Sequence, residues 1–132
     1  MENRCPGSVA LGPAVLQDHR LTFPRHSITW DAGSAGVVPA EGLVVEGALY
    51  ELTQIHIDLL DSYEGVGGGN HDRQTIAVET SNGSTIAQVY IANAQDGAPF
   101  TPSNKYLATM IRGAVAHGLS DHWIEMLRAL LP

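Results

Sequence analysis

The chain has 132 residues, of which 44% are hydrophobic and 16% charged, and its seven basic and fourteen acidic residues give a net charge of -7. These values are typical of one soluble globular domain, 1–132, and the scattered positive side chains argue against a nucleic-acid partner. There is no apolar run of roughly 20 residues for a membrane span and no secretion signal at the N-terminus, and Cys5 is the only cysteine; these features predict a cytoplasmic protein.

Short β-compatible segments dominate the first part of the chain. Apolar and β-branched residues alternate with glycine, proline and polar residues that are typical of turns. The small-residue segment includes Gly33, where the absence of a Cβ permits close backbone approach. The predicted strands are residues 9–16, 21–23 with a continuation at 28–30, 33–39 and 43–52, and the predicted turns are 17–20 and 41–42.

A hairpin and three helices follow. Asn82-Gly83 is a strong turn signal, and the segments 73–80 and 85–92 on its two sides predict a β-hairpin. Each helix is predicted from a capping residue and an apolar face. The helices are 53–62, capped by Thr53 with Ile57 and Leu60 inward; Ser103 to Gly118, with Leu107, Met110, Ile111, Ala114 and Val115 inward; and one capped by Ser120, with Trp123, Leu127 and Leu130 inward.

Strands therefore come first along the chain and helices mostly last. This order is typical of the α+β class, and we expect a small mixed β-barrel-like sheet flanked by helices. Trp30 and Trp123 lie in apolar patterns, so both are expected to pack in the core.

The main candidate for a chemically active side chain is Glu64, which lies where an apolar helix meets a glycine-rich loop. Glycines cannot cover the carboxylate, and the partial negative charge of a helix C-terminus does not stabilise it. A carboxylate in this position is suited to general acid–base chemistry. The alternative, a solvated glutamate at an ordinary helix end, is the commoner case on composition alone.

Three further residues are candidates for contact with a ligand. Tyr63 and Gly65 flank Glu64, and Tyr106 either fills the core or offers its hydroxyl group to a ligand. Together with Gly33, they are the predicted substrate-binding residues.

The other motifs favour structural roles. The glycine run within 65–69 follows a helix and lacks a Lys-Ser/Thr pair, so it is interpreted as a flexible connector, or as a flap over a pocket, and not as a phosphate loop. His71, His117 and His122 match no zinc spacing and are interpreted as surface residues. Cys5 has no base at a recognisable spacing and is interpreted as a thiol without chemistry.

Several separated motifs occur in a fixed order along nearly the whole chain. They are Arg4-Cys5-Pro6, Gly12-Pro13-Ala14-Val15-Leu16, Trp30, Gly47-Ala48-Leu49-Tyr50-Glu51-Leu52, Leu60-Asp61-Ser62-Tyr63-Glu64-Gly65-Val66, Pro102-Ser103 with Tyr106, and Gly113-Ala114 through Gly118-Leu119. In order and spacing, these motifs resemble the γ-glutamylcyclotransferase, or AIG2-like, family.

The resemblance implies a reaction on a small γ-glutamyl substrate. Family members let the substrate's α-amine attack its own γ-carbonyl, which releases 5-oxoproline and an amine. Because both reacting groups belong to one molecule, a folded substrate pose can give effective molarities on the order of 10⁵ to 10⁸ M. The resemblance assigns proton transfer to Glu64 and implies neither a metal nor an organic cofactor.

The resemblance also has departures. The family's first strand and its Tyr-Gly-Ser-Asn loop, which holds the glutamyl part of the substrate, are expected upstream of Met1, so that the domain is incomplete at its N-terminus. The alternative is a protein that has lost this strand, with an open sheet edge and poor or no catalysis. Glu46, His71 and Ser120-Asp121 replace a tryptophan, a tyrosine and a proline that are common in the family, which leaves the substrate open.

Two other functions stay open. One is a non-catalytic binding or assembly module on the same fold, with a homodimer formed through the exposed sheet edge. The other is a tailoring enzyme that removes or rearranges an acyl group on a specialised metabolite.

Overall fold

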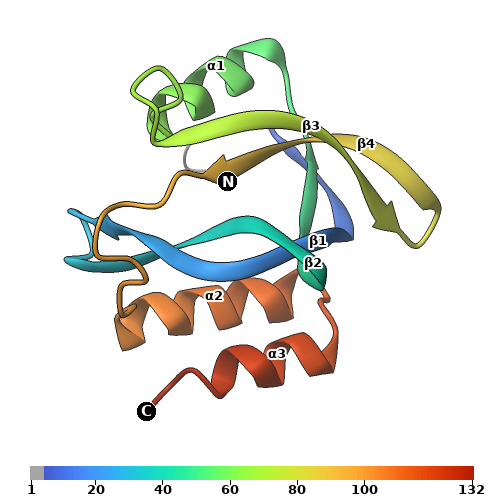
Figure 1. Ribbon diagram of the computed structural model, residues 1–132. Coiled ribbons are helices and arrows are strands. Elements are labelled where there is room, and N and C mark those ends of the chain that lie inside the picture. Colours follow the sequence, from blue (N-terminus) through green and yellow to red (C-terminus); the bar gives the residue numbers. More distant parts are fainter. Residues whose placement is uncertain (1–4) are drawn as a thin grey trace.

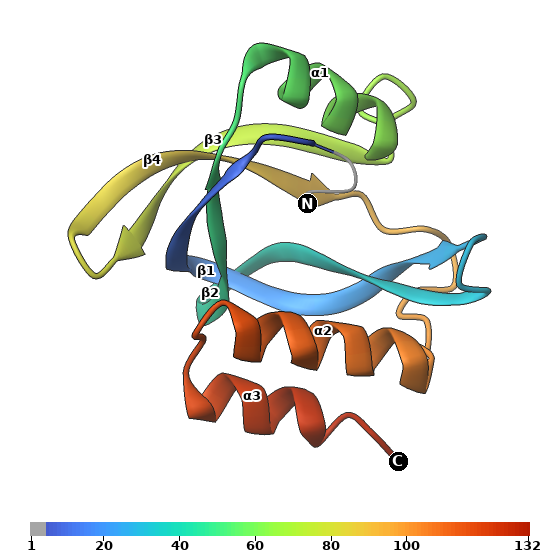
Figure 2. The same ribbon diagram turned by 180° about the vertical axis from the view of Figure 1, so that it is seen from behind.

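The computed structural model describes residues 5–132, in which a four-stranded antiparallel sheet is flanked by helices (Figure 1). α2 and α3 lie on the side of β1 and β2, and α1 lies on the other side, next to β3; the view from behind shows the same arrangement (Figure 2). The elements are β1 (Val9–Ser27), β2 (Ala32–Glu51), α1 (Gln54–Tyr63), β3 (His71–Thr80), β4 (Gly83–Ala92), α2 (Asn104–Ala116) and α3 (Asp121–Arg128).

The α+β class is confirmed, and the sheet has a simpler pattern than expected. Its strand order is β2-β1-β3-β4, and every described strand pair is antiparallel, so the sheet is not mixed. β1 and β3 are joined through the single pair Val15 and Glu79. β2 and β4 are the two edges of this order, and the sheet is therefore not closed into a barrel.

β1 and β2 are long strands because two predicted turns are in fact opposite sides of one β-bulge. The register passes from Gln17–Val44 to His19–Pro39, so Asp18 faces the extra residues of β2. Asp18 has a φ of 59° and Gly42 a φ of 80°. The Gly42 N–H donates to Asp18 Oδ1 at 3.0 Å, which satisfies the backbone where the ladder is interrupted.

The connections between the strands also differ in detail from the sequence prediction. Residues 28–30 do not continue a strand; they form the turn between β1 and β2, and the Ile28 side chain is 94% exposed. The predicted hairpin of β3 and β4 is confirmed, with Thr80 paired to Gly83. Its turn is Ser81-Asn82, one residue earlier than expected.

The predicted capping residues begin all three helices. The side chains of Thr53, Ser103 and Ser120 each accept a hydrogen bond from the backbone N–H three residues later, which satisfies an otherwise unpaired donor. The core lies between the sheet and α2 and α3, where Trp123 and Leu127 are buried. The prediction that Val115 and Leu130 point inward is wrong, since these residues are 55% and 44% exposed.

Among residues 5–132, no helix is long and apolar enough to cross a membrane. One of the sequence motifs, Arg4-Cys5-Pro6, begins at Arg4, which lies outside the described residues, as does Met1.

Candidate active site

Glu64 is fixed by the way in which α1 ends. It is the C-cap residue, and Gly65 follows it with a φ of +64°, in the left-handed region that favours glycine. The Gly65 N–H donates to Ser62 O at 3.2 Å, and the Val66 N–H donates to Asp61 O at 3.0 Å. This pair of hydrogen bonds is a Schellman motif, so the backbone of Glu64 is held between a helix and a closed turn.

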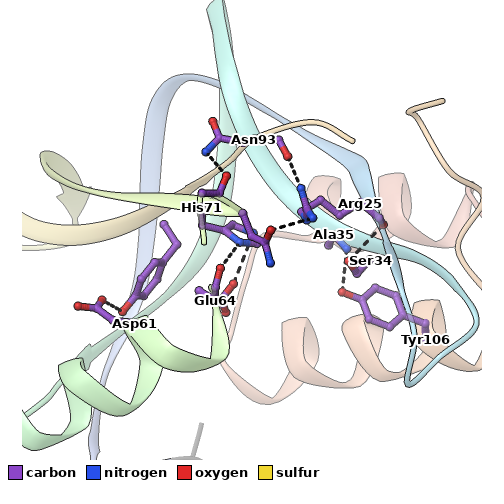
Figure 3. Close-up of polar contacts among 11 residues, drawn as sticks. Arg25, Ser34, Ala35, Asp61, Glu64, His71, Asn93 and Tyr106 are labelled. Atoms are coloured by element: carbon purple, nitrogen blue, oxygen red, sulfur yellow. Dashed lines mark hydrogen bonds and ion pairs between the residues drawn. The ribbon is translucent and has the colours of Figure 1, made fainter. Parts of the chain in front are cut away.

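The glycine loop returns the chain to the same place. The Asn70 N–H donates to Gly65 O at 3.0 Å, and the Asn93 N–H donates to Asn70 O at 2.9 Å. Arg25 Nη2 donates to Asn70 Oδ1 at 3.0 Å, and Arg25 Nη1 donates to Asn93 O at 2.8 Å. These contacts link the loop to β1 and to the end of β4, and they bring His71 back beside Glu64 (Figure 3).

The His71 imidazole contacts Glu64 at two points. His71 Nδ1 lies 2.8 Å from the backbone oxygen of Glu64, and Nε2 lies 3.4 Å from the side-chain oxygen Oε2 (Figure 3). The two side chains are mostly buried, with exposed fractions of 16% for His71 and 27% for Glu64. Coulomb interactions at this depth are screened less than at the surface.

A second carboxylate, Asp61, lies one helical turn before Glu64. Its Oδ1 accepts a hydrogen bond from the Tyr90 hydroxyl at 2.7 Å and one from Arg73 Nε at 2.9 Å. Burial raises the pKa of the Tyr90 phenol well above its ordinary value, and the hydrogen bond to Asp61 raises it further. Tyr90 therefore remains a neutral hydrogen-bond donor, and Asp61 serves to link α1 to β3 and β4.

A cavity of about 630 Å³ opens beside Glu64. Its walls come from β2, α1, β4 and Leu11, and its size is within the range of small-molecule sites. A smaller cavity of about 250 Å³ is lined by residues of all four strands. The polar side chains on the wall of the larger cavity are Tyr50, Glu51, Glu64, Thr85, Gln88 and Tyr90, and its other lining residues are apolar.

Comparison with known proteins is decisive for the family. Residues 44–127 match the AIG2-like family. The protein named gamma-glutamylcyclotransferase from Mus musculus is 31% identical over 134 residues, which cover 98% of this chain and 70% of the relative. The chain belongs to the γ-glutamylcyclotransferase family.

Solved structures support the same assignment. A structure named gamma-glutamyl cyclotransferase has a TM-score of 0.91 at 26% identity, and the match covers 99% of this chain and 79% of that one. A protein from Homo sapiens described as uncharacterized has a TM-score of 0.89 at 28% identity, with the same coverage. The γ-glutamylcyclotransferase-like fold expected from the sequence motifs is therefore confirmed.

In this γ-glutamylcyclotransferase-family chain, the predicted site residues do not all line one cavity. Glu64 lines the larger cavity, whereas Tyr63, Gly65, Tyr106 and Gly33 are not among its lining residues. Tyr63 is 61% exposed at the end of α1. Gly65 shapes the turn that holds Glu64, as described above.

Gly33 lies at the start of β2, and Tyr106, in α2, contacts the same part of that strand. The Tyr106 hydroxyl accepts a hydrogen bond from the Ala35 N–H at 2.8 Å, and its ring packs edge-on against Trp30 with centroids 5.1 Å apart. Gly33 donates its N–H to Thr101 O at 2.8 Å. A Cβ at Gly33 would lie 2.5 Å from the Phe100 carbonyl oxygen, so the close approach expected there is to the chain's own backbone.

His71 is the site residue that the sequence analysis missed. It was interpreted as a surface histidine, which is wrong, because its side chain is only 16% exposed and contacts Glu64. The spacing of residues in the sequence does not predict this contact, because the loop between Glu64 and His71 is shaped by several hydrogen bonds and not by a repeating sequence pattern. His117 is also partly buried, with Nε2 2.8 Å from the Tyr50 hydroxyl oxygen.

Two of the departures from the family pattern contact each other. Glu46 accepts hydrogen bonds from the backbone N–H of Ser120 at 2.9 Å and from its hydroxyl group. Glu46 does not line the larger cavity. The pair therefore joins β2 to the N-terminus of α3, where a carboxylate is favourable.

Proposed function

We propose that this chain is a γ-glutamylcyclotransferase-like enzyme that releases 5-oxoproline from a γ-glutamyl amide or dipeptide. The observation that supports this function best is the Glu64 carboxylate, which is held by a closed turn on the wall of a mostly apolar cavity. The family membership supports the same class of small-molecule substrate.

In the proposed reaction, the substrate folds so that its α-amine nitrogen attacks its γ-carbonyl carbon. A nitrogen–carbon bond forms and closes the five-membered ring, and the original amide carbon–nitrogen bond breaks. Glu64 takes a proton from the attacking amine and returns it to the departing amine, so no external reactant is consumed. A carboxylate in an apolar cavity is suited to this role because few waters compete for the transferred proton.

Tyr63, Gly65, Tyr106 and Gly33 remain the proposed substrate-binding residues. Gly65 would act through the turn that places Glu64, and Tyr106 through its hydroxyl group at the start of β2. Tyr106→Phe is expected to raise KM more than it lowers kcat, since in this proposal the hydroxyl group contacts the substrate equally in the ground state and in the transition state.

The test is 5-oxoproline formation by the purified protein, measured by mass spectrometry with a panel of γ-glutamyl dipeptides and γ-glutamylamines. Glu64→Gln keeps the side-chain volume and removes the base, so kcat should fall by about 10² to 10⁴. Glu125→Gln is the matched control, because Glu125 is an exposed residue of α3 paired with Arg128. Its kcat should equal that of the wild type.

Each failure has a separate meaning. Unchanged turnover in Glu64→Gln would remove Glu64 from the reaction. No 5-oxoproline from the wild type with any substrate of the panel would overturn the proposed function and favour a non-catalytic module on the same fold.

A further inference from the structure

The contact between His71 and Glu64 carries a further inference, which rests on the proposed function. A backbone carbonyl oxygen can only accept a hydrogen bond, so the 2.8 Å contact with Glu64 O requires that His71 Nδ1 carries the hydrogen. Nε2 is then the ring nitrogen that faces the carboxylate, at 3.4 Å from Oε2. The backbone contact thus decides which side of the imidazole is presented to Glu64.

The facing groups attract each other only if a proton is present between them. A neutral ring with hydrogen on Nδ1 has a lone pair on Nε2, which would repel an ionised carboxylate. A protonated imidazole, or a protonated Glu64, removes the repulsion and makes the contact favourable. The 3.4 Å contact thus places His71 Nε2 where it can bear on the position of Glu64 Oε2.

The chain geometry makes this contact specific. His71 is the first residue of β3, and its strand pairing with Ala92 fixes its backbone. Glu64 is fixed by the turn at the end of α1. Because both backbones are held, they cannot move to restore the contact when the side chain at position 71 changes. Only a side chain of suitable length and polarity at this position can contact Oε2 as His71 does.

We propose that His71 is a positioning residue for Glu64. Its Nδ1–H fastens the Glu64 backbone, and its Nε2 holds Oε2 in the orientation in which the carboxylate faces the cavity and takes the substrate's proton. His71 itself does not contact the reacting atoms.

Two variants separate the two contacts. The amide nitrogen of asparagine occupies the place of Nδ1, so His71→Asn keeps the donor to the Glu64 carbonyl and loses the group beside Oε2. The amide of glutamine reaches the place of Nε2, so His71→Gln keeps a donor to Oε2. Both are polar residues of similar or smaller size at the first residue of β3, and their urea unfolding midpoints should stay close to that of the wild type.

The kinetic outcome is specific. His71→Asn should lower kcat about 10-fold to 100-fold, as expected for a misplaced catalytic group, with KM almost unchanged. His71→Gln should recover most of the lost kcat. In a Glu64→Gln background, His71→Asn should have no further effect on kcat, because the group that it positions is already absent.

The possible results lead to different conclusions. If the wild type is active and His71→Asn has a wild-type kcat, the inference is wrong and the proposed function stands. If His71→Asn and His71→Gln both have a lower kcat, a higher KM and a lower free energy of unfolding, the role of His71 is only structural. The inference is again wrong in that case. If the wild type makes no 5-oxoproline, both the proposed function and the inference are overturned.

Discussion

The three glycines at positions 65, 67 and 69 allow the energetics of the turn after Glu64 to be measured one contribution at a time. Gly67 lies outside the left-handed region, and a Cβ there would meet nothing within 4 Å. Gly69 has a φ of +80° and also has open space around it. Gly65 combines a φ of +64° with a close neighbour, because its Cβ would lie 2.5 Å from Asn70 Nδ2 and 3.0 Å from Asn70 Cβ.

The expected free energies of unfolding follow from these geometries. Gly67→Ala should be neutral or stabilising by up to about 1 kcal/mol, since alanine restricts the unfolded chain. Gly69→Ala adds a left-handed penalty of about 1 to 2 kcal/mol, which gives a net loss of about 1 kcal/mol. Gly65→Ala also displaces Asn70 and breaks its hydrogen bond to Arg25, so its loss should reach about 3 kcal/mol.

Urea unfolding of the three variants measures these free energies of unfolding, provided that the variants share the same m-value. Gly65→Ala should also lower 5-oxoproline formation, because the turn that it strains holds Glu64. A Gly65→Ala variant as stable as Gly69→Ala would refute the contact with Asn70. Equal stability of Gly69→Ala and Gly67→Ala would refute the left-handed penalty.

Three further predictions concern other parts of the fold. Because the pKa of the Tyr90 phenol is raised in the folded protein, the neutral phenol stabilises the fold fully below about pH 10, and this stabilisation is lost as the pH rises further. Tyr90→Phe should therefore reduce the loss of stability at alkaline pH, measured as the change of the urea midpoint with pH. Ser120→Ala should cost about 1 kcal/mol, and a double-mutant cycle with Glu46→Ala should show a coupling of at least about 0.5 kcal/mol in unfolding free energy. Leu127→Ala should cost about 2 to 5 kcal/mol, whereas Leu130→Ala should cost under about 1 kcal/mol, as measured by thermal unfolding.

The features that could be predicted from sequence are those with local causes. Thr53, Ser103 and Ser120 each cap a helix through a bond to a residue three positions later, and this spacing is visible in the sequence. Glu64 at a helix end followed by glycine was predicted for the same reason. The predicted burial of Val115 and Leu130 is wrong because both residues lie at the margin of an apolar helix face, where the packing of neighbouring helices decides exposure.

The features that were missed depend on residues far apart in the chain. Asp18 and Gly42 each give a turn signal, but their pairing across two strands makes them one bulge. His71 reaches Glu64 only because Asn70 is held by contacts from β1 and β4. A local sequence pattern contains the residue types but not their distant partners. The bulge is therefore predicted as two separate turns, and His71 as a surface histidine.

The position of β2 and β4 has a consequence for assays at different protein concentrations. Within residues 5–132, these strands are the outer edges of the sheet, and they also form walls of the cavity beside Glu64. Any extended chain that added to either edge, including one from a second copy, would narrow that cavity. If self-association used either edge, the 5-oxoproline formation proposed above should fall as the protein concentration rises, and a specific activity that increases on dilution would be its sign.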